Sequence, residues 1–183
     1  MKDLDTAIAN TREHLLSLRN AAGHWEGELS SSALSTATAI VALSLVDAEK
    51  HDALIGKGAN WLIKHQNADG GWGDTSISKS NLSTTLLCWS ALSLVAKQRA
   101  NRCPDEAANA SVPELPLGSV FARCETWIRE QVGSLEPEAI CKAVIGRYGK
   151  DKTFSVPILM TCAIGGRLGE HGWKRVLPLP FEL

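Results

Sequence analysis

The residues of this sequence that could hold a metal or carry redox chemistry are its cysteines and histidines. The five cysteines are Cys88, Cys103, Cys124, Cys141 and Cys162. Their number is odd, and no two have the Cys-x-x-Cys spacing of a metal or redox pair. The five histidines, which are equally scattered, are His14, His24, His51, His65 and His171. Because neither set has the spacing of a ligand cluster, we expect reduced thiols, no metal site, no bound cofactor and no catalytic residue.

Length and charge limit the class of protein. The 183 residues fit a single domain, 1–183, that is long enough to bury a core. With 19 Lys and Arg against 20 Asp and Glu, we expect no nucleic-acid partner, because phosphate binding needs a concentrated positive face. The apolar runs 33–46 and 84–96 fall short of the ~20 residues of a membrane span. A polar N-terminus without a signal-peptide pattern predicts a cytoplasmic protein, and peripheral contact with the inner face of the membrane stays open.

An internal repeat is the strongest signal in the sequence. Residues 11–25 align with residues 58–72 at a constant offset of 47. The matched pairs are Leu15/Leu62, Asn20/Asn67, Ala21/Ala68, Gly23/Gly70 and Trp25/Trp72. The match continues into 34–46 and 82–95 with a drift of one or two residues. A period of this length with two helical stretches per unit predicts a stacked α/α repeat.

The elements that would position these residues are antiparallel helix pairs, so the predicted fold class is all-α. We place repeat units at about 3–50, 51–97 and 118–150, a loop at 98–118, and a closing helix with a Pro-rich, extended tail at 151–183. Polar residues at 30–32 and 80–81 are expected to cap the second helix of the first two units. Gly23 and the pair Gly70-Gly71 should end the preceding helices and turn the chain with positive φ. Pro137 and Pro157 each fit the first turn of a helix.

The segment 57–72 resembles the QW repeat of triterpene cyclases. It contains a basic and a small residue, the pair Trp61-Leu62, Gln66, and the ending Gly70-Gly71-Trp72. The segment 23–29 resembles the opening of squalene–hopene cyclases, and 151–183 resembles their N-terminal region. Arg19 stands where the first unit should have Gln, and the third unit, around Trp127, lacks the Gly-Trp ending. The resemblance implies the N-terminal part of such an enzyme, folded as an incomplete α/α barrel (toroid).

The QW motif predicts structural contacts rather than catalytic ones. Gln66 at a helix C-terminus can bond a carbonyl of its own helix and an N–H of the next. Trp72, after the Gly71 turn, can lie on the neighbouring unit and bury about 150–250 Å². Trp61 and Trp127 are likewise expected in the core, and Trp25 is the corresponding structural residue of the first unit. Within the family, such contacts are read as bracing against the heat of cyclisation.

The catalytic acid that the resemblance implies is missing. Family members protonate a terminal alkene with an aspartic acid of an Asp-x-Asp-Asp motif, whose pKa neighbouring carboxylates raise. Asp3-Leu-Asp5 is followed by Thr6, and the other six aspartates stand alone. We therefore expect scaffold and part of a cavity wall, with Ile164 facing an isoprenoid hydrocarbon substrate such as squalene. The chain alone should be inactive and should need a downstream domain or a second subunit.

Two other readings stay open from the sequence. One is a non-catalytic α/α repeat module that binds a lipid or a protein partner. The other is the β subunit of a protein prenyltransferase, although the Asp, Cys and His zinc set of that enzyme is not recognisable. An unfinished ring should leave apolar surface on its final helices. We expect that surface around Phe154, Ile158, Leu159 and Ile164.

Overall fold

The structure is a computed structural model that describes residues 2–101 and 115–178. These residues form seven α-helices: α1 (Lys2–Ser17), α2 (Ala33–Asp47), α3 (Asp52–Lys64), α4 (Leu82–Ala100), α6 (Leu117–Val132), α7 (Pro137–Tyr148) and α8 (Lys152–Ile164). A short 3-10 helix, η1, spans Gly172–Arg175. Within the described ranges no strand forms, and the only β-pairing is an isolated antiparallel bridge between Ser32 and Thr75. The all-α prediction is therefore confirmed.

The chain divides into two units, Met1–Ser30 and Ser31–Leu183. The first unit consists of α1 and the turn that follows it. The second unit holds all the other helices and the hydrophobic core.

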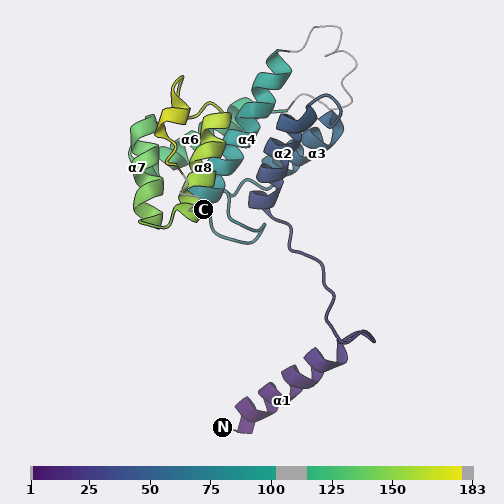
Figure 1. The fold of residues 1–183 in the computed structure, drawn as a ribbon. Coiled ribbons are helices and arrows are strands. Elements are labelled where there is room, and N and C mark those ends of the chain that lie inside the picture. Colours follow the sequence, from purple (N-terminus) through teal and green to yellow (C-terminus); the bar gives the residue numbers. More distant parts are fainter. Residues whose placement is uncertain (1, 102–114, 179–183) are drawn as a thin grey trace. The chain divides into compact units, whose positions relative to one another are not determined.

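In the second unit, α2, α4 and α8 form a row with α4 in the middle (Figure 1). α4 packs against α2 on one side and α8 on the other, and it also contacts α3 and α6. α3 packs against α2, and α7 packs against α8 and α6. This arrangement agrees with a helical repeat, whereas the barrel itself stays a prediction.

Side-chain caps fix the start of α2 and of α4, the second helices of the first two repeat units. Ser32 caps α2 by accepting a hydrogen bond from Ser35 N, and Asn81 caps α4 by accepting one from Thr84 N. Both helices have apolar residues on several faces, so they need neighbours on several sides. α4 meets that need: twelve of its 19 residues are buried. It therefore forms the centre of the core.

Three expectations about the later part of the chain need correction or a boundary shift. α4 continues through Ala100 and α6 begins at Leu117, so helix occupies both edges of the expected 98–118 loop; residues 102–114 lie outside the described ranges. The tail is not extended at 173–175, which belong to η1, and residues 179–183 are not described. The expectation of an exposed apolar surface was wrong for Ile158 and Leu159, because both face the core.

Candidate functional site

The turn that joins α3 to the segment before α4 is the best-defined polar site in the second unit. Trp72 lies at its end and is 1% exposed. The Trp72 indole Nε1 donates to the carbonyl of Leu62 in α3, 2.8 Å away. The Trp72 main-chain N–H donates to Thr85 Oγ1 in α4, at 3.0 Å. This one residue therefore ties the two helices of its own repeat unit together, whereas the expected packing of Trp72 on the neighbouring unit stays a prediction.

Gln66 links the same turn to the following repeat unit. Its Nε2 donates to the carbonyl of Gly70 at 2.8 Å and to the carbonyl of Val120, in α6, at 3.1 Å. Neither partner is of the expected kind: Gly70 lies in the turn after α3 rather than in the helix, and the partner in α6 is a carbonyl rather than an N–H. The Gln66 Oε1 is buried and has no hydrogen-bond partner among the described residues. Both amide protons are thus used to hold main-chain oxygens.

Two charged residues that sequence reasoning missed complete this turn. Asp69 Oδ1 accepts hydrogen bonds from Gly71 N (3.0 Å) and Ser80 Oγ (2.7 Å). Asp69 Oδ2 accepts one from the indole of Trp127 in α6, at 3.2 Å. Arg123, also in α6, donates to the carbonyl of Asn67 at 2.7 Å. The Asp69 contact could have been suspected from its place inside the motif, whereas nothing in the sequence pairs Arg123 with a residue 56 positions earlier.

The first repeat unit forms the same turn with almost the same hydrogen bonds. Trp25 Nε1 donates to the carbonyl of Leu15 at 2.6 Å. Asn20 N donates to His24 O at 2.9 Å, and its counterpart Asn67 N donates to Gly71 O at 3.0 Å. The positive φ angles also match, at 87° for Gly23 and 93° for Gly70. The predicted repeat is therefore a repeat of hydrogen bonds as well as of residues.

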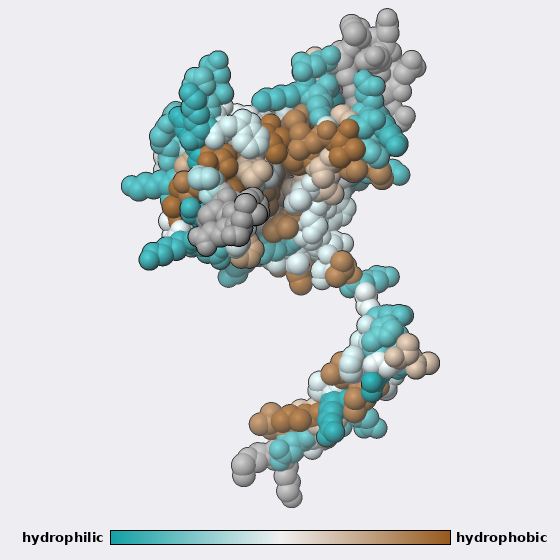
Figure 2. Space-filling model, viewed as in Figure 1, coloured by the Kyte–Doolittle hydropathy of each residue, from teal (hydrophilic) through white to brown (hydrophobic). Residues whose placement is uncertain are grey.

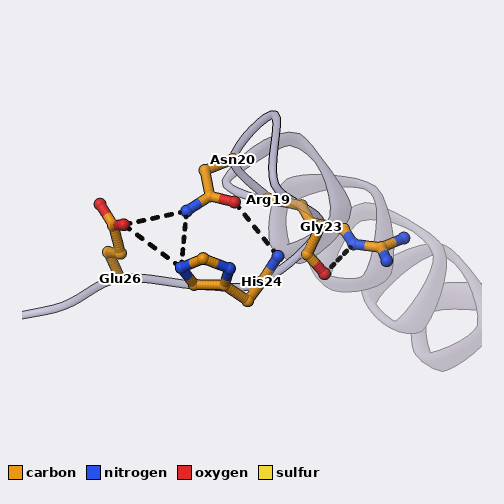
Figure 3. Close-up of polar contacts among 5 residues, drawn as sticks. All are labelled: Arg19, Asn20, Gly23, His24 and Glu26. Carbon is orange, nitrogen blue, oxygen red and sulfur yellow. Dashed lines mark hydrogen bonds and ion pairs between the residues drawn. The ribbon is translucent and has the colours of Figure 1, made fainter.

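Arg19 replaces glutamine in the first unit but keeps one of its two bonds. Its Nε donates to the carbonyl of Gly23 at 2.7 Å, the counterpart of the bond from Gln66 to Gly70 (Figure 3). The side chains of Asn20, His24 and Glu26 meet beside it, with Glu26 Oε1 3.1 Å from Asn20 Nδ2 and 3.3 Å from His24 Nε2. Within its unit this turn is open to solvent.

The remaining predicted site residues have mixed surroundings. Trp127 is buried, and Trp61 is half-buried and stacks on His65 with ring centroids 4.0 Å apart. Within its unit Trp25 is 48% exposed. A Cβ on Gly71 would lie 2.6 Å from the Cβ of Ser80, which explains why only glycine fits. Ile164, the last residue of α8, is half-buried against the core.

The carboxyl groups around the second turn are arranged to stay ionised. Burial alone would raise the pKa of Asp69, but hydrogen bonds from Ser80, the Gly71 N–H and Trp127 outweigh it and hold the pKa below its ordinary value. Hydrogen bonds from Thr84 and Asn81 lower the pKa of Asp74. An acid that protonates an alkene needs the opposite shift. These aspartates are therefore structural acceptors.

Thiols and metal-ligating groups offer no reactive centre in the described part of the chain. Four free cysteines lie there, and burial raises the pKa of Cys162 to about 12 and that of Cys88 well above its ordinary value. Thiols of this kind are protonated and unreactive at neutral pH. Within residues 2–101 and 115–178, no cluster of three or more His, Cys, Asp or Glu side chains is placed to hold a metal ion.

A groove of about 580 Å³ opens beside the second turn. Its lining includes Asn67, Asp69, Lys79, Trp127 and Gln131. The lining also includes Ala68 and Ile77, so both polar and apolar groups face the groove. None of the helices in the described ranges combines the length and the apolarity needed to cross a membrane.

One comparison with known proteins found a match to this chain. A family model described as the squalene-hopene cyclase N-terminal domain matches residues 8–110, which is more than half of the chain. The match covers both turns. Neither the curated proteins nor the solved structures contain a match to this chain.

Proposed function

Because the chain belongs to the family of squalene-hopene cyclase N-terminal domains, we propose that it is the N-terminal scaffold of a terpene cyclase. The reaction is a proton-initiated cyclisation of squalene or a similar isoprenoid hydrocarbon, an isomerisation that gives a hopanoid-type product. The observation that carries the proposal is the matched pair of turns, in which Trp25 and Trp72 make the same indole-to-carbonyl bond at the same place in successive repeats.

In this proposal the chain supplies structure and the acid comes from elsewhere. No Asp-x-Asp-Asp motif occurs in its sequence, and the pKa values of Asp69 and Asp74 are lowered. An isolated alkene is a very weak base, so it is protonated only by a neutral, well-positioned acid. A downstream domain or a second subunit therefore provides that acid, and the chain alone does not turn over substrate.

The work of the scaffold is to keep helices in place during an exothermic reaction. Gln66 and Arg123 fasten the second turn to α6, while Trp72 fastens α3 to α4. Ile164 at the end of α8 is the residue that we propose for the cavity wall. The enzyme would act in the cytoplasm, with peripheral contact at the inner face of the membrane, where its hydrocarbon substrate dissolves.

The test is complementation of activity. The purified chain is mixed or co-expressed with the acid-bearing remainder of a family cyclase, supplied with squalene in detergent, and the products are analysed by gas chromatography and mass spectrometry. We expect polycyclic product from the pair and none from either part alone. A matched control replaces the motif aspartates of the remainder with asparagine and should abolish product.

Two results would overturn the proposal. Product from the chain alone would mean that the acid lies within it. If the pair forms a stable complex but gives no product, while the chain alone binds squalene or another lipid, the non-catalytic α/α module becomes the better reading.

A further inference from the structure

Two adjoining hollows at one end of the second unit have no part in the proposed function. One is the groove of about 580 Å³ beside the second turn. The other, of about 460 Å³, lies between the start of α4 and the helices α6 and α7, at the lower end of the unit in Figure 1. Ser80, Trp127 and Gln131 line both hollows, so together they form one groove, here called the α4 groove. Each hollow has the size of a small-molecule site, about 300–1,000 Å³.

The carboxylate that lines the α4 groove is already engaged. Asp69 Oδ1 accepts hydrogen bonds from Gly71 N and Ser80 Oγ. Asp69 Oδ2 accepts one from the Trp127 indole. Ser80 Oγ in turn accepts a hydrogen bond from Asn67 Nδ2 at 3.0 Å. These bonds fix one wall of the groove and use both oxygens of its only carboxylate among the described residues.

The cations that line the α4 groove are not paired in this way. Lys79 lies in the loop before α4, and Arg147 lies on α7. In the part of the chain that the structure describes, neither side chain makes a hydrogen bond or a close ion pair. Arg147 helps to lower the pKa of Asp74, but that carboxylate already accepts from Asn81 and Thr84. A groove with two cations and no unused carboxylate favours an anionic ligand.

Ile77 adds an exposed apolar group to the same groove. Its side chain is 94% exposed, the largest fraction for a large apolar residue among the described residues of the second unit. It belongs to the loop before α4, whereas the brown surface of this unit in Figure 2 gathers over α2. Trp127 and Ala143 contribute further apolar lining. A ligand that combines an anionic group with an apolar one would use both kinds of lining.

We infer that the α4 groove binds a phosphate monoester that carries a short hydrocarbon group. The phosphate lies beside the Gln131 amide, which lines both hollows, and the hydrocarbon group covers Ile77. A phosphate monoester has a charge of about −1.5 to −2 at neutral pH and three strong acceptor oxygens. These match the two cations and the amide, whereas a carboxylate supplies a single charge. The inference goes beyond the proposed cyclisation, because a hydrocarbon substrate has no anionic group.

The first test is isothermal titration calorimetry of the full chain at low ionic strength. The probes are inorganic phosphate, hexyl phosphate and hexanol, and we expect hexyl phosphate to bind most tightly. Lys79→Gln and Arg147→Gln should each weaken its binding about tenfold, because each removes one charge-assisted hydrogen bond. Lys57→Gln and Lys142→Gln remove exposed cations outside the groove and should leave the affinity unchanged. Circular dichroism checks that every variant is folded.

The second test separates the two parts of the ligand and its two sources. Ile77→Ser should weaken the binding of hexyl phosphate but not that of inorganic phosphate. Leu54→Ser, which changes an exposed leucine of α3 outside the groove, is the matched control and should weaken neither. Cosedimentation with phosphatidylcholine vesicles, with and without phosphatidic acid, then identifies the source. Vesicle binding that needs phosphatidic acid and is lost in Lys79→Gln indicates a lipid headgroup, and calorimetric binding without it indicates a free ester.

Three results would overturn the inference. The full chain could bind neither phosphate probe nor phosphatidic acid vesicles, which is also the result if another part of the chain fills the groove. Lys79→Gln and Arg147→Gln could weaken binding no more than the control variants, which would show attraction by overall charge alone. Hexanol could bind as tightly as hexyl phosphate, which would exclude recognition of the phosphate. None of these measurements uses squalene, so each result is independent of the proposed cyclisation.

Discussion

The indole Nε1 of Trp72 donates a hydrogen bond to the main-chain carbonyl of Leu62, 2.8 Å away, and the residues 47 positions earlier, Trp25 and Leu15, make the same bond at 2.6 Å. The two turns differ in what covers them. Trp72 is 1% exposed, and Trp25 is 48% exposed. The same local geometry therefore occurs once inside the core of the second unit and once in the first unit, which does not itself bury the indole. Comparing the two turns separates the contribution of the hydrogen bond from that of burial.

Replacing Trp72 should cost far more stability than replacing Trp25. Trp72→Ala removes a fully buried indole, and such a change typically costs about 3–5 kcal/mol. Trp72→Phe keeps most of the apolar contact but loses the bond to Leu62, so we expect a loss of about 1–2 kcal/mol. Trp25→Ala and Trp25→Phe are the matched controls and should each cost less. Urea unfolding followed by circular dichroism measures the differences; equal losses for Trp72→Ala and Trp25→Ala would contradict the role given to burial.

The glycines of the two turns offer a second matched comparison. Both have positive φ, so alanine at either position carries a conformational cost of about 1–2 kcal/mol. A Cβ on Gly70 would also lie 2.5 Å from the carbonyl oxygen of Arg123, whereas a Cβ on Gly23 would meet only the flexible end of Arg19, at 3.1 Å. We expect Gly70→Ala to lower the free energy of unfolding at least about twice as much as Gly23→Ala. Urea unfolding of the two variants measures these losses. A larger loss for Gly23→Ala than for Gly70→Ala would show that the Arg123 contact does not constrain the turn.

The parts of the fold that could be predicted are those set by neighbouring residues. The caps at Ser32 and Asn81 and the positive φ of Gly23 follow from side-chain and backbone preferences, and all are confirmed. Of the pair Gly70-Gly71, only Gly70 has the expected positive φ. Pro137 begins α7 as predicted. Pro157 does not begin a helix, because Asp151 caps α8 six residues earlier and accepts from Thr153 N, so the proline lies inside the helix.

The parts that could not be predicted depend on contacts distant in sequence. Ile158 and Leu159 were expected at the surface, but α8 packs against α4 and turns them inward. The repeat identified Gln66 and Trp72 as paired structural residues. It gave no sign of Arg123, which reaches back from α6 to the turn, because only the folded chain brings these segments together.

Acid should weaken the second turn. The pKa values of Asp69 and Asp74 lie below that of an unfolded aspartate, about 3.9. Between the unfolded and folded pKa values the unfolded chain binds more protons, so the stabilisation from these carboxylates is present above about pH 4 and is lost as the pH falls through their folded pKa values. Asp69→Asn with Asp74→Asn should flatten the decline in unfolding free energy below about pH 4. Parallel pH curves for the variant and the parent chain would show that these carboxylates do not contribute to it.

Arg167, just after α8, joins three elements of the second unit. Its guanidinium carbon lies 4.1 Å from the ring centroid of Trp89 in α4 and 4.9 Å from that of Phe121 in α6. Its Nη1 is 3.7 Å from Glu125 Oε1, which also accepts a hydrogen bond from the Trp89 indole at 3.3 Å. Burial lowers the pKa of Arg167, and its Nε has no hydrogen-bond partner among the described residues.

The contributions of Arg167 and Glu125 to stability depend on each other, because both side chains are mostly removed from water. Glu125→Leu alone leaves the guanidinium without its carboxylate, and Arg167→Met alone leaves the carboxylate without its cation. Removing one partner of a largely buried pair is costly, whereas replacing both by apolar residues of similar size is often nearly neutral. We therefore expect the double variant to be more stable than the sum of the single losses predicts, by at least about 1 kcal/mol. Denaturation midpoints of the four chains at neutral pH give this coupling directly, and strictly additive losses would mean that the rings of Trp89 and Phe121, rather than Glu125, hold Arg167 in place.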